Sequence, residues 1–421
     1  MVVWYAVVGV LFTVVLVGAD ALVVFLITGV TLAISRIPSD AARPACPFAA
    51  EGWTARRLRE EAADGLDARA RQHRPDADYG ATTLAAYALY PPLLVAGPVL
   101  TFNAFASQLS SPRRAAAAPA AVLGYAARWL LVALILEAWL HAWPVYAINA
   151  AAVTVCNGVP VDAAGAPLGA SVSRPALPHA AAGGPVPAAQ GCHEEQLLAR
   201  LDLQETLALW EASVALLWIK FVVVWRFFRA AALADGMDVE ENQASCVWMT
   251  SSIGGFWRGW HRSFNRWIVR YLYVPLGGSA GSVAGQAASS ALVFAFVALW
   301  HEFSAQLLLW GLVFGVLTAP ELLLDRLVHS ARSEWARRLR QSAWYPLVVA
   351  VQGTLAVFIL IFGNLLGFGT GVRGLGAYAQ RFGSWEGLVA WVLFAGWHLA
   401  VVSLSSSVRA ARGFEVSRPP L

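Results

Sequence analysis

Long apolar runs are the feature that most constrains what this chain can fold into. A helix needs about 20 mostly apolar residues to cross the hydrocarbon core of a bilayer. Only 13% of the 421 residues are charged, against about 25% in average soluble domains. We therefore predict an all-α, polytopic transmembrane helical bundle rather than a soluble domain. The candidate spans are residues 2–17, 19–34, 82–105, 120–148, 206–228, 287–324, 344–368 and 385–405.

Two of these runs are not single straight helices. Tyr90-Pro91-Pro92 and Gly97-Pro98 interrupt the run 82–105, and proline removes a backbone donor and clashes with the preceding turn. Broken backbone at membrane depth must be buried in protein or line a cavity, so we expect re-entrant or interfacial pieces here. The run 287–324 is too long for one span, and we predict two crossings with a turn near residues 301–306.

The runs divide the chain into three parts. Residues 1–36 are predicted to form N-terminal membrane helices, and the first run lacks the basic start of a signal peptide, which favours an uncleaved anchor. Residues 37–81 form a charged loop, predicted to be cytosolic. Residues 82–421 form the membrane core, with an Ala- and Pro-rich insertion at about 154–199.

Arginine placement predicts the sidedness of the loops, because basic residues prefer the cytosol. The segments 113–114, 226–229 and 326–340 carry arginine clusters and are predicted to be cytosolic. The insertion has Arg174 as its only basic residue, so we predict a flexible luminal segment. The net charge of +4 fits these cytosolic arginines and gives little support for a nucleic-acid partner.

Two cysteines bracket the insertion. Cys156 and Cys192 lie near its two ends, in a segment that would face an oxidising compartment if the predicted sidedness holds. The sequence is compatible with a disulfide between Cys156 and Cys192 and with two unpaired thiols. The spacing of the four cysteines matches no zinc pattern, and we predict no metal site.

The stretch FWRGWHRSFNRWIVRYLYVPLGGS, residues 256–279, concentrates cations in an otherwise apolar chain. At about 100° per residue, a helix over 258–271 would place Arg258, Arg262, Arg266 and Arg270 on one stripe. His261 and Asn265 would share the border between this stripe and an aromatic face. An interface helix that binds lipid phosphates is one interpretation. The other is an arginine wall for a nucleotide pyrophosphate, since guanidinium groups bind phosphate in a bidentate way.

A second signal is ALWHEF, residues 298–303, where His301 and Glu302 interrupt an apolar run. A lone histidine in such a run is more often structural, but two histidines in polar motifs favour a site. A desolvated imidazole stays neutral near pH 7 and can act as a general base. The remaining histidines, His398 among them, have no supporting motif. The acidic stretch DGMDVEENQ, residues 235–243, lacks the EF-hand pattern and is predicted to be a structural loop.

The two histidine motifs, together with YPPLLVAGPVLTFNAF (90–105) and IKFVVVWRFFRAAALADGMDVEEN (219–242), resemble the membrane-bound O-acyltransferase family. In this order they are most similar to the branch of fungal glycerol-uptake proteins and Hedgehog acyltransferase-like proteins. The resemblance implies a bundle with a central tunnel. It also implies that His301 corresponds to the family's near-invariant histidine and His261 to its second polar position.

The resemblance further implies a function. Members move an acyl group from cytosolic acyl-CoA to an acceptor alcohol or amine, and the fungal branch is linked to GPI-anchor lipid remodelling in the endoplasmic reticulum. We thus expect an enzyme of that membrane, with lyso-GPI or a lysophospholipid as acceptor and no permanently bound cofactor. His301 and His261 would be catalytic, and Arg258, Arg262, Arg266 and Asn265 would bind the donor. A protein acyltransferase, or a non-catalytic transporter or scaffold with the same fold, are the alternatives.

Overall fold

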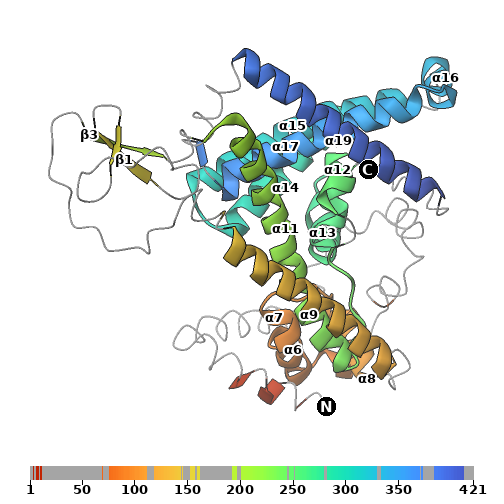
Figure 1. The fold of residues 1–421 in the computed structure, drawn as a ribbon. Coiled ribbons are helices and arrows are strands. Elements are labelled where there is room, and N and C mark those ends of the chain that lie inside the picture. Colours follow the sequence, from red (N-terminus) through yellow and green to blue (C-terminus); the bar gives the residue numbers. More distant parts are fainter. Residues whose placement is uncertain are drawn as a thin grey trace. The chain divides into compact units, whose positions relative to one another are not determined.

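The structure is a computed structural model, and it describes most of the chain after residue 74 (Figure 1). Before that point it describes only a few single residues and short pieces, among them Arg69. The predicted spans 2–17 and 19–34 therefore lie largely outside the described residues. The described residues after that point are 75–110, 118–143, 145, 152–156, 159–161, 192–196, 201–243, 246–250, 252–278, 282–329, 333–369, 371–372 and 384–411.

Among the described residues, six helices are long and apolar enough to cross a membrane. This finding confirms the all-α polytopic prediction. The six segments are Pro119–Ala142 (α9), Leu203–Ala234 (α11), Val283–His301 (α14), Ala305–Leu324 within α15 (Ala305–His329), Tyr345–Phe368 (α17) and Trp385–Leu404 within α19 (Trp385–Ala411).

The chain divides into two compact units that alternate along the sequence. The first unit comprises Met1–Ile135, Ile219–Ser245 and Phe256–Ser289. The second comprises Leu136–Trp218, Cys246–Gly255 and Ser290–Leu421. His261 belongs to the first unit and His301 to the second.

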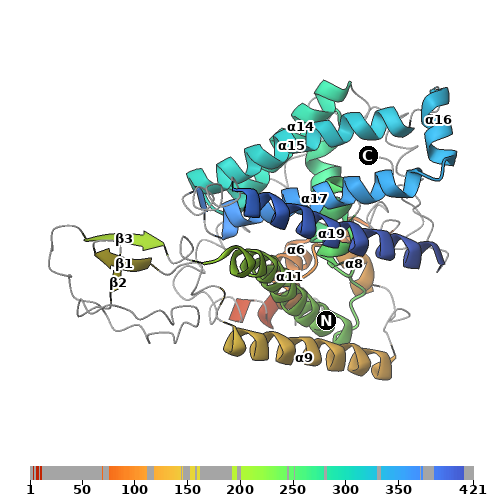
Figure 2. The ribbon, with the colours of Figure 1, turned by 45° about the horizontal axis from the view of Figure 1, so that its top comes forward.

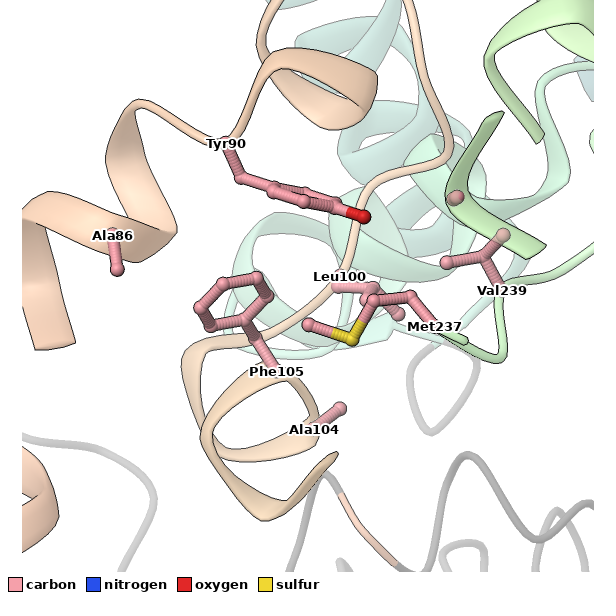
Figure 3. Close-up of a cluster of buried hydrophobic side chains, with 8 residues drawn as sticks. Ala86, Tyr90, Leu100, Ala104, Phe105, Met237 and Val239 are labelled. Carbon is pink, nitrogen blue, oxygen red and sulfur yellow. The ribbon is translucent and has the colours of Figure 1, made fainter. Parts of the chain in front are cut away.

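In the first unit, the proline-containing run is broken as predicted. It forms α6 (Ala81–Ala88), α7 (Pro91–Leu94) and α8 (Phe102–Ser110), with Pro91 at the start of α7. A 3₁₀ turn, η4 (Asp76–Tyr79), precedes α6. The buried rings of Tyr90 and Phe105 meet in a cluster with Leu100, Met237 and Val239 (Figure 3). Burying this apolar surface fixes the broken run against the loop 235–243.

In the second unit, α15, α17 and α19 run side by side, with α16 (Glu334–Gln341) beyond one end of α15 and α17 (Figure 2). Glycines allow the close approach of α15 to α17. A Cβ on Gly363 would lie 2.3 Å from Cε2 of Phe314, and one on Gly367 would lie 2.5 Å from Cδ1 of Trp310. Side chains at these two positions would collide with the aromatic rings, so the contact depends on glycine.

The start of α11 is fixed by a reciprocal cap. The backbone N–H of Glu205 donates to Oδ1 of Asp202 at 2.8 Å, and the N–H of Asp202 donates to Oε2 of Glu205 at 2.9 Å. This is the capping-box arrangement, with aspartate in the place of serine or threonine.

The insertion contains a small antiparallel sheet of order β2-β1-β3, whose three strands are labelled in Figure 2. Its strands are β1 (Ala152–Cys156), β2 (Val159–Val161) and β3 (Cys192–Gln196). The prediction of a wholly flexible segment is thus wrong for these strands. The physical reason is the β-branched run of Val153, Thr154 and Val155, which favours extended backbone. The register pairs Cys156 with Cys192, and the disulfide between them stays a prediction.

Candidate active site

His301 is the last residue of α14. The next residues form a short break, in which the N–H of Ser304 donates to the carbonyl of Glu302 at 2.9 Å. The hydroxyl of Ser304 then accepts from the N–H of Leu307 at 3.3 Å, within the first turn of α15. The predicted turn near residues 301–306 is confirmed as a helix break, and it leaves the histidine at a helix terminus rather than in the middle of a span.

Three aromatic rings surround the imidazole of His301. The ring centroids of Trp300, Phe368 and Trp310 lie 5.0, 5.2 and 6.0 Å from it, each in an edge-on arrangement. Gln306 donates from Nε2 to the carbonyl of Gly367 at 2.9 Å, which ties the start of α15 to the end of α17.

His301 is nevertheless an exposed residue, and Phe303, two positions later in the chain, is 85% exposed. The arrangement offers an accessible imidazole in an apolar, aromatic setting, which suits a general base.

His261 lies at a backbone break and not inside a continuous helix. The stripe helix divides into α12 (Ile253–Gly259), α13 (Arg262–Ile268) and a π-helical turn (Val269–Tyr273). His261 has φ 44° and ψ 52°, the left-handed conformation that non-glycine residues rarely adopt. The prediction of one helix over 258–271 is therefore wrong.

The break at His261 has a physical cause in the loop 235–243. The carbonyl of Asn242 accepts from the N–H of Arg262 at 3.1 Å. The side-chain Oδ1 of Asn242 accepts from both the N–H and the hydroxyl of Ser263, at 3.1 and 2.6 Å. Trp260 forms a β-bridge with Gln243. These tertiary hydrogen bonds replace the helical ones that sequence periodicity assumes.

Aromatic packing orients His261. Its ring lies 4.7 Å from that of Trp225 and 5.2 Å from that of Phe264, measured between centroids. The N–H of Asn265 donates to the carbonyl of His261 at 2.9 Å, so Asn265 follows one turn into α13. The predicted i, i+4 relation between these two residues therefore persists, with His261 as the N-cap.

The predicted donor-binding arginines lie on both sides of this break. Arg258 is in the last turn of α12, and Arg262 and Arg266 are in α13. Both arginines of α13 pair with Glu240, at 3.6 Å and 2.7 Å. Glu240 thus neutralises part of the stripe and orients it. Binding of phosphate by these residues stays a prediction.

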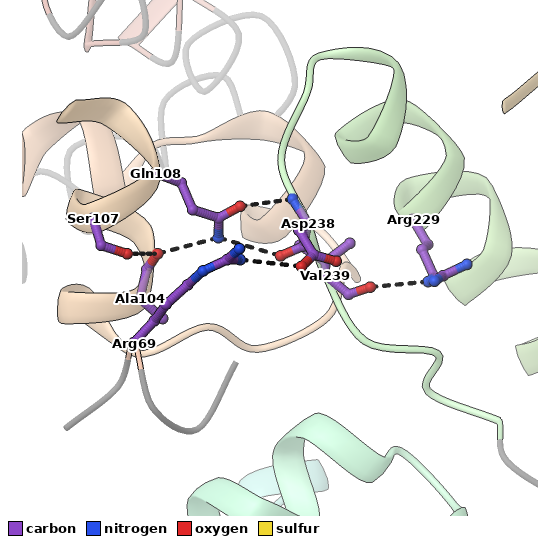
Figure 4. Close-up of polar contacts among 7 residues, drawn as sticks. All are labelled: Arg69, Ala104, Ser107, Gln108, Arg229, Asp238 and Val239. Carbon is purple, nitrogen blue, oxygen red and sulfur yellow. Dashed lines mark hydrogen bonds and ion pairs between the residues drawn. The ribbon is translucent and has the colours of Figure 1, made fainter. Parts of the chain in front are cut away.

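The loop 235–243 is the structural element that the sequence predicted. Asp235 accepts from the hydroxyl of Tyr90 at 2.7 Å. Asp238 pairs with Arg69 at 3.0 Å, and its N–H donates to Gln108 Oε1 at 2.7 Å (Figure 4). Arg229 donates to the carbonyl of Val239 at 3.0 Å. In the part of the chain that the structure describes, no group of three or more His, Cys, Asp or Glu side chains is placed to hold a metal ion.

Sequence reasoning missed a buried polar group in the second unit. His398 in α19 is fully buried, and its Nε2 lies 2.7 Å from Oε1 of Glu211 in α11. Glu211 also accepts from Nε1 of Trp248 at 2.7 Å. A signal was available, because Glu211 and His398 are isolated ionisable residues within two predicted spans, and such residues usually have a partner.

The fold and these sites define a class: a polytopic helical membrane protein with a histidine at a helix break and a second histidine in an arginine-rich motif. The sequence pattern of the membrane-bound O-acyltransferase family matches residues 16–155 and 203–362. The chain belongs to this family.

Named relatives refine the comparison. The chain is 30% identical to Membrane-bound O-acyltransferase GUP1 of Saccharomyces cerevisiae over 300 residues, 71% of this chain and 43% of that protein. It is 30% identical to gup1 of Schizosaccharomyces pombe over 76% of this chain and 46% of that protein. Protein-cysteine N-palmitoyltransferase HHAT of Mus musculus is 26% identical over 41% of this chain and 36% of its own length. The chain spans less than half the length of each of these relatives.

Proposed function

We propose that this protein is an acyltransferase that moves a long-chain acyl group from acyl-CoA to a lipid hydroxyl on the luminal side of the endoplasmic reticulum membrane. The acceptor class is lyso-GPI or a lysophospholipid. The observation that carries the proposal is the exposed imidazole of His301 at the break between two apolar helices, ringed by Trp300, Trp310 and Phe368. The names of the fungal relatives support the acyl-transfer chemistry.

In the proposed mechanism, His301 is the general base. It takes the proton from the acceptor hydroxyl as that oxygen attacks the thioester carbonyl. The new ester bond forms as the carbon–sulfur bond breaks, and CoA leaves as the thiolate and takes up a proton. A base of this kind contributes about 10²–10⁴-fold to the rate.

The donor is proposed to bind at the motif of the first unit. The donor arginines (Arg258, Arg262 and Arg266) would contact the phosphates, and guanidinium groups suit that contact geometrically. His261 and Asn265 would orient the thioester or donate to the developing oxyanion, a stabilisation of about 3 kcal/mol for one good donor. The unusual backbone of His261, fixed by Asn242, supports a functional role because strained conformations concentrate at active sites.

The arginine distribution supports a sidedness for these steps. Donor phosphates would be on the cytosolic side, and the acceptor would approach His301 from the lumen. Cysteines introduced at positions 262 and 304 of a chain without its own cysteines should react with impermeant maleimides from opposite sides of sealed vesicles. Labelling of both positions from the same side contradicts this sidedness.

A second acceptor class has its own support. The mouse relative is named Protein-cysteine N-palmitoyltransferase, so a secreted protein's N-terminal amine is the alternative acceptor. The two classes give different bonds, because a lipid hydroxyl yields an alkali-labile ester and an amine yields an alkali-stable amide.

One assay separates these possibilities. The purified full chain in lipid nanodiscs is incubated with radiolabelled palmitoyl-CoA and, in turn, lyso-GPI, a lysophospholipid and a peptide with an N-terminal cysteine. We expect an alkali-labile product with one of the two lipids. An alkali-stable product with the peptide alone supports the alternative, and no transfer to any acceptor contradicts the proposal.

A further inference from the structure

Two carboxylates that lie within apolar helices hold one short stretch of the second unit, residues 246–255, which we call the clamped segment. This segment contains the 3₁₀ turn η6 (Val247–Met249) and the first residues of α12. Val247 and Ile253 are 2% and 1% exposed, so the segment is part of the core. The same unit carries His301.

The first carboxylate is Glu211. Its Oε2 accepts from Nε1 of Trp248 at 2.7 Å, and its Oε1 contacts Nε2 of His398 at 2.7 Å. The imidazole of His398 packs against the rings of Phe394 and Phe358, whose centroids lie 4.6 and 5.7 Å from its own. Both carboxylate oxygens are therefore engaged, and the histidine fixes the glutamate that holds the segment.

The second carboxylate is Glu321, which directly follows the proline inside α15. Its Oε2 accepts from the N–H of Ile253 at 2.6 Å, and its Oε1 accepts from the N–H of Gly254 at 2.9 Å. These are the first two residues of α12, whose N–H groups have no partner within their own helix. A negative charge at this end also complements the helix dipole.

The use of carboxylates here requires explanation. Ionisable groups in membrane spans are energetically costly and usually mark function. Well-packed apolar residues often stabilise a core as well as a buried ion pair does, so stability alone does not require them. The carboxylates instead fix positions along the chain. The two backbone N–H groups bound by Glu321 determine where α12 begins, and the indole bound by Glu211 holds the 3₁₀ turn before it. That helix ends at Gly259, two residues before His261.

We infer that Glu211 and Glu321 are positioning residues for acyl transfer: they fix the clamped segment and with it the start of α12, the helix that ends two residues before His261. This inference rests on the proposed function. His398 supports Glu211 in that role. Because a misplacement of 1 Å can reduce a rate by about 10²-fold, loosening the segment should lower kcat while leaving the KM for acyl-CoA nearly unchanged.

Two mild variants test the inference. Trp248→Phe keeps an aromatic ring but removes the indole N–H from which Glu211 accepts, together with part of the ring volume. Glu321→Gln keeps one acceptor oxygen for the two N–H groups. The matched controls are Trp335→Phe and Glu334→Gln on α16, where Trp335 is 61% exposed and the side chain of Glu334 is 62% exposed. All four substitutions are made in the full chain in nanodiscs.

Hydrogen–deuterium exchange and steady-state kinetics provide the two readouts. We expect faster exchange confined to residues 246–259 in Trp248→Phe and Glu321→Gln, with kcat reduced by up to about 10²-fold and the controls unchanged. Unchanged exchange in this segment, or unchanged kcat despite faster exchange, overturns the inference. An inactive wild-type protein instead contradicts the proposed function, so the two failures are distinguishable.

Discussion

Removing the side-chain oxygen of Asn242 should disturb both the stability of the first unit and the geometry of His261. Asn242 is 1% exposed, and its Oδ1 accepts two hydrogen bonds from Ser263. One of these bonds caps the first turn of α13, and loss of such a cap costs about 0.5–2 kcal/mol. The hydroxyl bond adds about 1 kcal/mol. Asn242→Ala should therefore lower the free energy of unfolding by about 2 kcal/mol.

Intrinsic fluorescence is a suitable assay, because the chain contains 19 tryptophans. On the scale for domains of 150–250 residues, a loss of this size lowers the melting temperature by about 4–8 °C. Asn242→Asp keeps an acceptor oxygen and should recover part of the loss. Asn103→Ala is the matched stability control, since it removes a hydrogen bond from Tyr79 on an exposed part of the surface.

The same variant should reduce acyl transfer more than its effect on folding explains, because Asn242 also fixes the break at His261. Transfer is measured below the melting transition, where all variants are folded. An Asn242→Ala protein with unchanged melting temperature and unchanged transfer would refute the role assigned to this cap.

The remaining predictions concern packing, a thiol and the donor site. Gly363→Ala should destabilise the protein by about 1–3 kcal/mol, because its Cβ would lie 2.3 Å from a ring carbon of Phe314. Gly396→Ala should have no such effect on the melting temperature, because its Cβ would meet no atom within 4 Å beyond the adjacent backbone of its own helix. Burial raises the pKa of the Cys246 thiol, so its thiolate forms at higher pH than that of an ordinary thiol. Iodoacetamide labelling of a chain with Cys246 as its only cysteine should be slower than that of glutathione at pH 8 and should accelerate as the pH is raised; equal rates at pH 8 contradict the prediction. Replacing the three donor arginines by Gln should raise the KM for acyl-CoA, because each phosphate contact contributes roughly 1 kcal/mol to binding. An unchanged KM would contradict donor binding and favour the interpretation that these arginines bind lipid phosphates.

Helix positions could be predicted well because hydropathy acts locally. The apolar runs after residue 118 became helices whose ends lie within six residues of the predicted ones. Proline chemistry likewise predicted the broken run around Pro91, and run length predicted the break after His301. In each case the cause lies in the residues of the segment itself.

The site could be predicted only in part, because tertiary contacts decide its details. Periodicity treated residues 258–271 as one helix, but the hydrogen bonds that Asn242 accepts and the bridge of Trp260 to Gln243 break it at His261. The pair of Glu211 and His398 joins residues 187 positions apart. Their isolation in apolar spans signals that each has a partner, but no local pattern reveals which residue that partner is. Likewise, the ion pairs of Glu240 with the arginines of α13 depend on how a distant loop folds.

The central claim is that His301 is the general base of the proposed acyl transfer, and its substitution is the most direct test. His301→Ala protein, purified in nanodiscs, is compared with wild type and with His141→Ala, whose side chain is exposed at the end of α9. Transfer from palmitoyl-CoA, binding of a non-hydrolysable acyl-CoA analogue and melting temperature are measured on the same preparations. We predict that transfer by His301→Ala falls by about 10²–10⁴-fold, while binding and melting temperature remain at wild-type values and His141→Ala is fully active. Undiminished transfer by the His301→Ala protein would contradict the account.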